Sequence, residues 1–396
     1  MSGDGERFIR CQHCKLPHAA SETACPVTGA PIARRKPLSP MDAPRQELAG
    51  FPIGKEPPVW RMSLHGEDLA EDEVAESGGF LGRIIDNKYR IEELIGCGGM
   101  GAVYRAQHLR LDRKVAIKVL LRGHRVGSVA EQRFVREARI ASALRHRNIV
   151  SIVDVGVLKE GTPFQVMELL EGRSLGQQLR LHGALDTETV LSIGIDILGA
   201  VGAAHVRGVL HRDIKPDNVF LAETSEDGPF TVCAKLVDFG ISKSVEKESI
   251  VLTRPGSMMG TPIYFAPEQA RGLAADFRTD VYSTGATLYE AITGRPPFVS
   301  SSYVDLIRQI RTTRPAAIRT LVPSVPEMAE RVIQKMMEAE PEARFQTASE
   351  AQAALKQVHA QVLAASTQET VLPSVTMDIS LDSLSPDADD VTLRFE

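Results

Sequence analysis

A glycine-rich turn lies in the stretch YRIEELIGCGGMGAVYRAQH, which begins at Tyr89. Gly96, Gly98 and Gly101 let the backbone approach a ligand closely, and exposed backbone N–H groups can then surround a phosphate. The flanking residues predict a strand on each side of the turn. A dinucleotide-binding turn requires a helix directly after the glycines, and the β-forming residues from Val103 argue against one. An ordinary glycine hairpin stays open as an alternative.

A lysine ends the next apolar strand, VAIK, at Lys118. A lysine on a buried strand is costly unless it meets a negative partner, and a phosphate or a carboxylate could be that partner. The following segment, QRFVREARIASALRHRNIV, has an apolar stripe at helical spacing, and Glu137 lies beside this stripe. Taken in isolation, Glu137 could equally be a solvated carboxylate on a helix surface.

A dense group of charges, HRDIKPDN, lies farther along the chain between apolar elements. Its Asp213, Lys215 and Asn218 suit a site that positions a hydroxyl, neutralises a phosphoryl group and holds a metal through hard oxygen ligands. A second candidate metal ligand, Asp238, begins the sequence DFG directly after an apolar strand. These residue types predict chemistry on a metal-bound phosphate.

These motifs, together with APE at Ala266 to Glu268, occur in the order and at the separations of the protein kinase signature set. Over roughly residues 89 to 359, the chain resembles the eukaryotic-like (Hanks-type) serine/threonine protein kinases of bacteria. The resemblance implies an α+β, two-lobed fold. A small β-rich lobe with one helix (αC) and a larger helical lobe would hold ATP between them.

The resemblance also implies a role for each charged residue. Lys118 would bind the α- and β-phosphates of ATP and form an ion pair with Glu137. Asp213 would meet the substrate hydroxyl, and Asn218 and Asp238 would hold Mg²⁺. The implied cofactors are therefore ATP and Mg²⁺, with Mn²⁺ as a substitute.

The other nucleotide-binding residues implied by the resemblance surround the phosphates and the adenine. Met167 is the expected gatekeeper, and Glu168 and Leu169 form the expected hinge, which would bind adenine through backbone groups. The full expected set is Ile95, Gly96, Gly98, Gly99, Gly101, Val103, Ala116, Lys118, Glu137, Met167, Glu168 and Leu169.

The implied reaction is transfer of the ATP γ-phosphoryl group to serine or threonine hydroxyls of protein substrates. Lys215 resembles the lysine that marks serine/threonine specificity, and the sequence GTPIY at Gly260 agrees. The expected catalytic residues are Asp213, Lys215, Asn218 and Lys118. An alternative of another class is a pseudokinase scaffold that only binds partners, and these intact residues argue against it.

Three further residues are expected to be structural. Asp280 resembles a buried helix aspartate that braces the catalytic loop, and Arg344 is expected to pair with Glu268. Losing either interaction would damage the fold, because breaking a buried ion pair on one side costs roughly 3 to 5 kcal/mol.

Activation-loop phosphorylation is expected to regulate the domain. By resemblance, Arg212 is placed to receive a phosphate, which would order the loop through charge-assisted hydrogen bonds. Thr253 is the first candidate for the phosphate, with Ser257 second and Ser249 third. Thr261 is expected to shape the floor of the peptide site instead. Self-association for trans-autophosphorylation belongs to the same hypothesis.

The N-terminal cysteines resemble an incomplete zinc ribbon. Cys11-x-x-Cys14 is followed by Cys25-Pro-Val-Thr28, in which Thr28 stands where a fourth cysteine is expected and is a poor zinc ligand. The histidines that could complete a Cys₃His site are His13 and His18. A metal-free segment that merely retains three cysteines remains the alternative.

Composition bounds the remaining classes. The chain has 396 residues, of which 43% are hydrophobic and 24% charged, and a net charge of −5, so neither a disulfide-stapled miniprotein nor bulk attraction to nucleic acid or anionic lipid is expected. The odd number of cysteines and the polar first residues favour a reducing cytoplasm. The apolar run from Val190 to Leu210 is interrupted by charge and predicts a buried core helix, not a membrane span.

Four parts are therefore expected along the chain: a zinc-ribbon-like segment at 1–35, a disordered linker at 36–85, a kinase domain at 86–360, and an acidic tail at 361–396. The tail contains serines and threonines, and phosphorylation there could dock a phosphopeptide-binding protein. Acidic disordered tails often have no such specific role.

Overall fold

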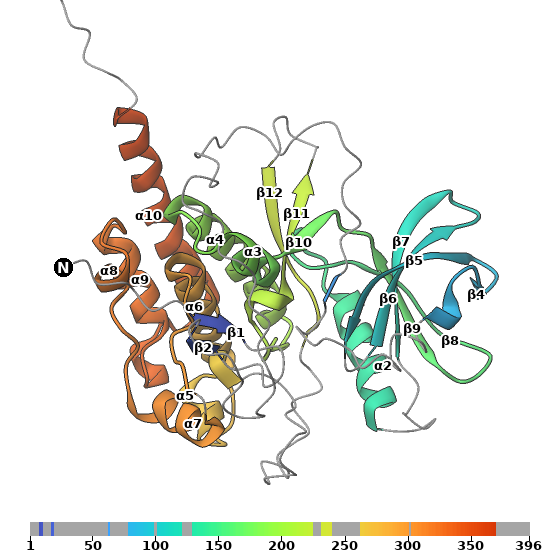
Figure 1. Cartoon of the computed structure of the whole chain (residues 1–396), viewed down its shortest axis with the longest axis horizontal. Coiled ribbons are helices and arrows are strands. Elements are labelled where there is room, and N and C mark those ends of the chain that lie inside the picture. Colours follow the sequence, from blue (N-terminus) through green and yellow to red (C-terminus); the bar gives the residue numbers. More distant parts are fainter. Residues whose placement is uncertain are drawn as a thin grey trace, which may run out of the picture.

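The protein is described by a computed structural model covering residues 8–10, 17–19, 62–63, 78–98, 101–120, 129–224, 231–239, 262–300 and 302–369. In these residues a small lobe, mostly a β-sheet, stands beside a larger lobe, mostly helical (Figure 1). The expected α+β, two-lobed architecture is confirmed.

The sheet of the small lobe has the strand order β3-β5-β6-β7-β9-β8, and β4 pairs with β5. Neighbouring strands run antiparallel, except that β3 is parallel to β5. The strands are β3 (Met62–Ser63), β4 (Ile84–Ile85), β5 (Tyr89–Gly98), β6 (Gly101–His108), β7 (Arg113–Leu120), β8 (Ile152–Val157) and β9 (Pro163–Glu168).

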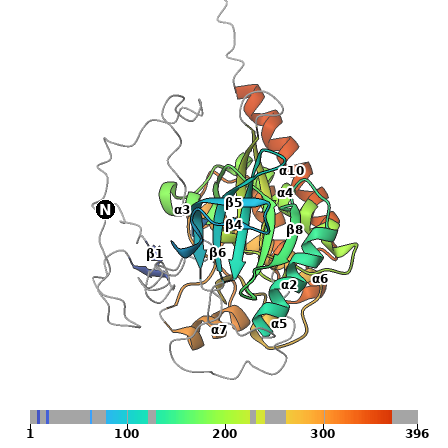
Figure 2. The same cartoon turned by 90° about the vertical axis from the view of Figure 1, so that its right-hand side faces the viewer.

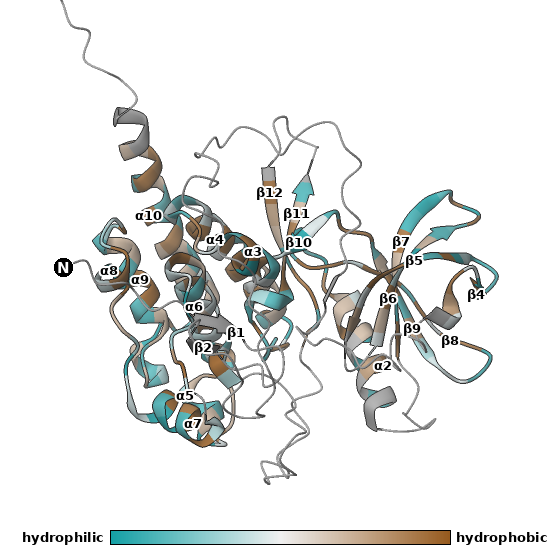
Figure 3. Ribbon diagram, viewed as in Figure 1, coloured by the Kyte–Doolittle hydropathy of each residue, from teal (hydrophilic) through white to brown (hydrophobic). Residues whose placement is uncertain are grey.

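Apolar side chains on the strands form the core of the small lobe. Tyr104, Ile117 and Val166 are fully buried in it. The outer end of β7 is hydrophilic and its inner part is hydrophobic (Figure 3). Helix α2 (Val129–Ala143) lies beside β8 (Figure 2) and also contacts β9, and its predicted apolar stripe is buried at Phe134 and Ala138. Lys118 thus lies on β7 and Glu137 on α2, and both of these elements contact β9.

The folded domain begins before residue 86. A 3-10 turn, η1 (Gly78–Phe80), precedes β4, and the ring of Phe80 lies 5.7 Å from that of Tyr104. Residues 78–85 of the expected linker therefore belong to the folded small lobe, as does β3 at Met62–Ser63. Composition hid this segment because its few apolar residues are surrounded by glycine and charge, and their burial depends on a partner elsewhere in the sequence.

The larger lobe consists of helices and a short antiparallel sheet of order β10-β11-β12. The helices are α3 (Leu175–His182), α4 (Thr187–His205), α5 (Pro267–Ala270), α6 (Phe277–Thr293), α7 (Tyr303–Thr312), α8 (Ile318–Leu321), α9 (Glu327–Met336) and α10 (Ala348–Glu369). The strands are β10 (Gly172–Ser174), β11 (Val219–Thr224) and β12 (Thr231–Leu236). The 3-10 turns are η2 (Pro216–Asn218), η4 (Pro262–Tyr264) and η5 (Pro341–Ala343). Near the N-terminus, β1 (Phe8–Arg10) pairs antiparallel with β2 (Pro17–Ala19).

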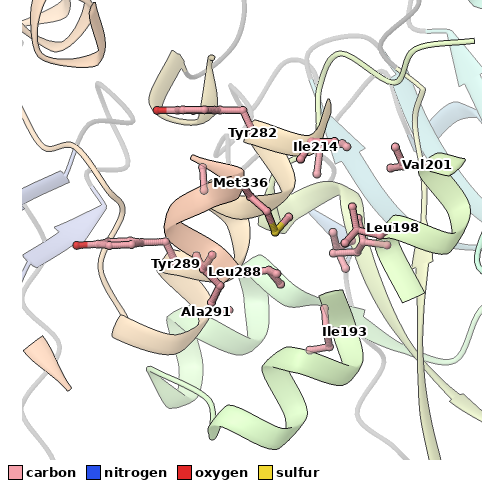
Figure 4. Close-up of a cluster of buried hydrophobic side chains, with 14 of the residues drawn as sticks. Ile193, Leu198, Val201, Ile214, Tyr282, Leu288, Tyr289, Ala291 and Met336 are labelled. Atoms are coloured by element: carbon pink, nitrogen blue, oxygen red, sulfur yellow. The ribbon is translucent and has the colours of Figure 1, made fainter. Parts of the chain in front are cut away.

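Helix α4 is the centre of the large-lobe core. It packs against α6, α10 and β12, and the labelled side chains of α4, α6 and α9 in Figure 4 meet in one cluster. A Cβ at Gly194 would lie 2.7 Å from side-chain carbons of Leu288 and Leu355, so glycine permits this close approach. By length and composition α4 could cross a membrane, with a mean hydropathy of 1.4, but here it is the buried core helix that the sequence predicts.

The ends of two helices are set by local sequence. Asp186 caps α4, because its Oδ1 accepts a hydrogen bond from Thr189 N at 2.8 Å. Gly294 ends α6 in a left-handed conformation with φ 69°. At the other end of the domain, α10 runs to Glu369, so the expected start of the tail at residue 361 lies within a helix.

Candidate active site

Lys118 lies between the two lobes. Strand β7 places it opposite Val103 on β6 and Gln165 on β9. Its Nζ lies 2.6 Å from Oδ1 of Asp238, and both side chains are at most 14% exposed. Two residues separated by 120 positions therefore meet. Glu137 lies on α2, and its side chain is outside the described residues.

Asp280 braces the catalytic loop from α6. Its Oδ2 accepts a hydrogen bond from His211 N and its Oδ1 accepts one from Arg212 N, each at 2.8 Å. Nε2 of His205 lies 2.8 Å from Oδ2 of the same carboxylate. Arg212 takes a left-handed conformation, with φ 65°, which a non-glycine residue keeps only when its surroundings hold it. The expected bracing role of Asp280 is thus confirmed by geometry.

The loop also fixes the candidate catalytic aspartate. Lys215 Nζ lies 3.2 Å from Asp213 Oδ2. Nδ2 of Asn218 donates to the backbone oxygen of Asp213 at 2.8 Å and to its Oδ2 at 3.2 Å. Asp213, Lys215 and Asn218 therefore form one contiguous polar group at the start of η2 and β11.

The buried side chain of His211 contacts this loop. It is fully buried, its Nδ1 accepts a hydrogen bond from Asp213 N at 3.3 Å, and its ring centroid lies 4.6 Å from that of Phe239. Burial lowers the pKa of the imidazole and outweighs the nearby carboxylates of Asp280 and Asp213, which raise it. His211 is therefore neutral at neutral pH, as its accepting nitrogen requires.

The residues expected to hold Mg²⁺ fit that ion. Because Asn218 uses Nδ2 to bind Asp213, its Oδ1 is left buried and without a hydrogen-bond partner among the described residues. Asp238 supplies a carboxylate close by in the loop after β12, in a left-handed conformation with φ 54°. Amide and carboxylate oxygens are the hard ligands that Mg²⁺ prefers. Phosphate oxygens and waters would supply the other ligands of Mg²⁺.

An apolar pocket adjoins Lys118 and Asp238. Most of the residues expected to contact adenine lie in its wall, and Val150, Leu170 and Val237 join them although the sequence did not single them out. Val237 directly precedes Asp238 and could have been found from that position. The lining residues are Ile95, Val103, Ala116, Lys118, Val150, Met167, Glu168, Leu169, Leu170, Val237 and Asp238.

The glycine-rich segment is a β-hairpin at the edge of this pocket. Gly96 pairs with Val103, and Gly98 pairs with Gly101. A Cβ at Gly101 would lie 2.5 Å from the backbone oxygen of Val119, so glycine is required there for close strand contact. Because a strand follows the glycines, the dinucleotide-binding alternative is excluded. Gly99 is outside the described residues.

The expected ion pair between Glu268 and Arg344 is present in the larger lobe. Nη1 and Nη2 of Arg344 lie 2.9 and 2.7 Å from the two carboxylate oxygens, and the Thr279 hydroxyl donates to Oε1 at 2.7 Å. Burial by itself raises the pKa of Glu268, but the hydrogen bonds and charge of Arg344 outweigh it, so the pKa lies below its usual value.

Several predicted sites lie outside the described residues. They are the candidate phosphosites Thr253, Ser257 and Ser249, the peptide-floor residue Thr261, and the candidate zinc ligands Cys11, Cys14 and Cys25. These remain predictions from sequence.

Comparison with known proteins agrees with this geometry. A family model described as the protein kinase domain matches residues 89–358. The serine/threonine-protein kinase pkn3 of Myxococcus xanthus is 40% identical over 238 residues, which cover 60% of this chain and 43% of that protein. The serine/threonine-protein kinase PrkC of Bacillus subtilis is 37% identical over 277 residues, covering 70% and 41% of the two chains.

The solved kinase domain of Mycobacterium tuberculosis PknI matches with a TM-score of 0.53 and 28% identity, covering 70% of this chain and 98% of that one. The chain spans only about two fifths of the length of the curated relatives, with 43% of pkn3 and 41% of PrkC matched. The family model, over residues 89–358, nevertheless includes every motif of the site, from the glycine-rich hairpin to the Glu268–Arg344 pair. This chain belongs to the protein kinase domain family.

Proposed function

We propose that this protein transfers the γ-phosphoryl group of ATP to serine or threonine hydroxyls of protein substrates in the presence of Mg²⁺. The observation that carries the proposal is the contact of 2.6 Å between Lys118 and Asp238, which joins the two lobes beside the apolar pocket. Similarity to relatives named serine/threonine-protein kinases supports it.

The pocket residues would hold the adenine, and the hairpin would cover the phosphates. Val103, Ala116, Met167 and Leu169 all line this pocket. Lys118 is then placed at the inner end of the pocket, where it can bind phosphate oxygens. The apolar wall of the pocket and Lys118 together would therefore hold ATP in position.

Asp213 would orient the attacking hydroxyl and accept its proton. In phosphoryl transfer the charge spreads over the phosphoryl oxygens, so positioning and positive charge lower the barrier most. Lys215, 3.2 Å from Asp213, can bind the transferring group while Asp213 binds the hydroxyl. Asn218 and Asp238 would hold Mg²⁺, which when bound neutralises the phosphate oxygens.

Autophosphorylation with labelled ATP tests this proposal. The wild-type chain is expected to incorporate phosphate at serine or threonine, and Asp213→Asn is expected to slow incorporation about 10²-fold or more, because the general base is lost. Phosphoamino-acid analysis identifies the acceptor. A wild-type chain that binds ATP but transfers no phosphate to itself or to any protein would favour the scaffold alternative.

We also propose that a phosphate on the activation loop binds Arg212. The Nε of Arg212 is buried and has no hydrogen-bond partner within the part of the chain that the structure describes. Thr253→Ala is expected to lower the activity, whereas Thr261→Ala nearly abolishes it, as measured by initial rates on a protein substrate. Wild-type rates in Thr253→Ala would remove Thr253 from this role.

Two further proposals extend this one. A second copy of the chain would phosphorylate the loop in trans, and a phosphopeptide-binding protein would dock on the tail.

A zinc site at Cys11, Cys14 and Cys25 is a separate proposal. The paired strands β1 and β2 flank Cys11 and Cys14 along the chain, which supports it. Elemental analysis of the purified full chain is expected to find about one zinc per chain by the usual stoichiometry of such sites. A variant with all three cysteines changed to serine is the control.

A cytoplasmic location remains a further proposal, which fractionation of the source cells would test.

A further inference from the structure

An ion pair outside the kinase signature motifs connects the hinge to β12. Nζ of Lys235 lies 2.9 Å from Oε1 and 3.1 Å from Oε2 of Glu168. The side chains of Lys235 and Glu168 are 15% and 30% exposed, so water screens this pair only partly. The two residues are 67 positions apart, Glu168 at the end of β9 and Lys235 on β12.

Glu168 is fixed at both its backbone and its side chain. It ends β9 and lines the nucleotide pocket. Its backbone N–H donates to Ser151 O at 3.0 Å, and its Oε1 accepts a hydrogen bond from Ser151 N at 2.8 Å. A displacement of the Glu168 carboxylate would therefore move the hinge backbone with it.

Lys235 projects from a strand that is itself anchored. The backbone N–H of Ala234 donates to Asp196 Oδ2 on α4 at 2.9 Å, and that of Leu236 donates to Asn148 O at 2.8 Å. The next residue, Val237, donates to Asn218 O at 3.0 Å. β12 is thus held to α4 and to the catalytic loop immediately before Asp238.

Strand geometry places Lys235 on the pocket side of β12. Side chains alternate along a strand, so Lys235 shares a face with Val237, which lines the pocket, whereas Leu236 points into the large-lobe core. In register, Lys235 lies opposite Phe220, which belongs to the apolar cluster around the pocket. Lys235 therefore reaches Glu168 along the boundary of the nucleotide site.

We propose that Lys235 is a positioning residue for ATP. Through Glu168 it sets the distance between the hinge wall of the pocket and the wall formed by Val237 and Asp238. This inference rests on the proposed function. A pocket that is held in its bound shape before ATP arrives loses less conformational freedom on binding, and charge-assisted hydrogen bonds are strong enough to hold it.

The experiment compares the affinity for Mg²⁺–ATP with the rate of phosphoryl transfer in the full chain. Lys235→Met is expected to raise both the Kd of a fluorescent ATP analogue and the KM for ATP by about threefold to tenfold, while kcat changes less than about twofold. Lys235→Arg, which keeps the charge and can bind a carboxylate with two donors, is expected to restore most of the affinity.

Lys88→Met is the matched control. Like Lys235, Lys88 pairs with carboxylates, Asp86 at 2.7 Å and Asp154 at 3.3 Å, but it lies in the small lobe, away from the nucleotide pocket. Its variant is expected to keep the wild-type KM. Glu168→Gln should reproduce the effect of Lys235→Met, and the double variant should be no weaker than either single variant, because both remove the same interaction.

Thermal melting of each variant identifies those that are folded at the assay temperature. If Lys235→Met is not folded, Glu168→Gln carries the test. An unchanged Kd and KM in a folded Lys235→Met, or a loss of affinity that Lys235→Arg does not reduce, overturns the positioning role alone. A wild-type chain that binds no nucleotide overturns the proposed function as well, so the two failures can be told apart.

Discussion

His211 shows how one buried side chain can link the fold to pH. The residue is wholly buried under the catalytic loop and contacts the backbone of Asp213 and the ring of Phe239. Its neutral form matches these contacts, since Nδ1 accepts a hydrogen bond. Protonation would place a charge in a dry environment and remove that acceptor.

We predict that this histidine makes stability fall with acidification below pH 6.5. The pKa of His211 is lowered from 6.5 by burial, so the unfolded chain binds the proton more tightly, and the free energy of unfolding falls as pH drops from 6.5 towards the folded-state pKa. The slope for this residue is at most about 1.4 kcal/mol per pH unit. Urea unfolding at several pH values between 6.5 and 5 measures it.

The control is His211→Asn, which keeps an acceptor for Asp213 but cannot titrate. It is expected to be less stable at pH 7 and to have a flatter pH dependence than the wild type. The pKa of Glu268 is lowered from 4.5, so the stability that its carboxylate contributes is lost only below pH 4.5, outside the range from pH 6.5 to 5. An identical slope in both proteins would exclude His211, and His146, whose pKa burial also lowers, would be tested next.

At the scale of elements, the Glu268–Arg344 pair joins α5 to the segment that follows η5. Arg344 also donates from Nε to Glu338 O at 2.7 Å and from Nη2 to Ala339 O at 3.0 Å. Its side chain is fully buried and its guanidinium lies 4.9 Å from the ring centre of Tyr282. A single arginine therefore holds α5, α6 and the chain between α9 and α10 together.

We predict that Arg344→Met destabilises the protein by about 3 to 5 kcal/mol, because it leaves the Glu268 carboxylate buried without its cation. Chemical unfolding followed by circular dichroism measures the change. Arg331→Met is the control, since Arg331 pairs with Glu327 on the exposed surface of α9 and contributes about 0.3 to 0.5 kcal/mol. Equal effects of the two substitutions would contradict a structural role for the buried pair.

At the scale of the molecule, backbone hydrogen bonds connect the two lobes in addition to the hinge. Ile149 forms a parallel β-bridge with Leu236, and Val150 N donates to Leu236 O at 3.0 Å. The segment after α2 is therefore hydrogen-bonded to β12, which belongs to the large lobe. ATP would contact both sides of this junction, since the pocket includes Val150 and Val237.

We predict that Mg²⁺ and ATP together raise the melting temperature of the whole chain. A ligand at a hundredfold excess over its Kd adds about 2.7 kcal/mol to the free energy of unfolding. Asp238→Asn is expected to bind ATP without the additional stabilisation that Mg²⁺ gives, because it loses a carboxylate ligand. Scanning calorimetry with ATP, with ATP and Mg²⁺, and with neither measures the shift. The same melting temperature in all three conditions would contradict a nucleotide site between the lobes.

The sequence by itself determined the residues of the site and the order of the elements that carry them. Glycines before a strand, a lysine at a strand end and a charged loop between apolar segments are local patterns. Lys118, Asp213, Asn218 and Asp238 could be identified from such patterns, because each pattern depends only on the types and spacing of a few neighbouring residues. The family resemblance added the Asp280 brace and the Glu268–Arg344 pair, and the structure contains both.

Only the tertiary structure decided which distant residues meet. Phe80, in the turn η1, was assigned to a linker because its partner, Tyr104, lies on the distant strand β6. No local pattern singles out Lys235, which the fold brings to Glu168, 67 positions away. Such contacts depend on the twist of each sheet and the way elements pack across the whole domain, and short-range sequence patterns do not contain that information.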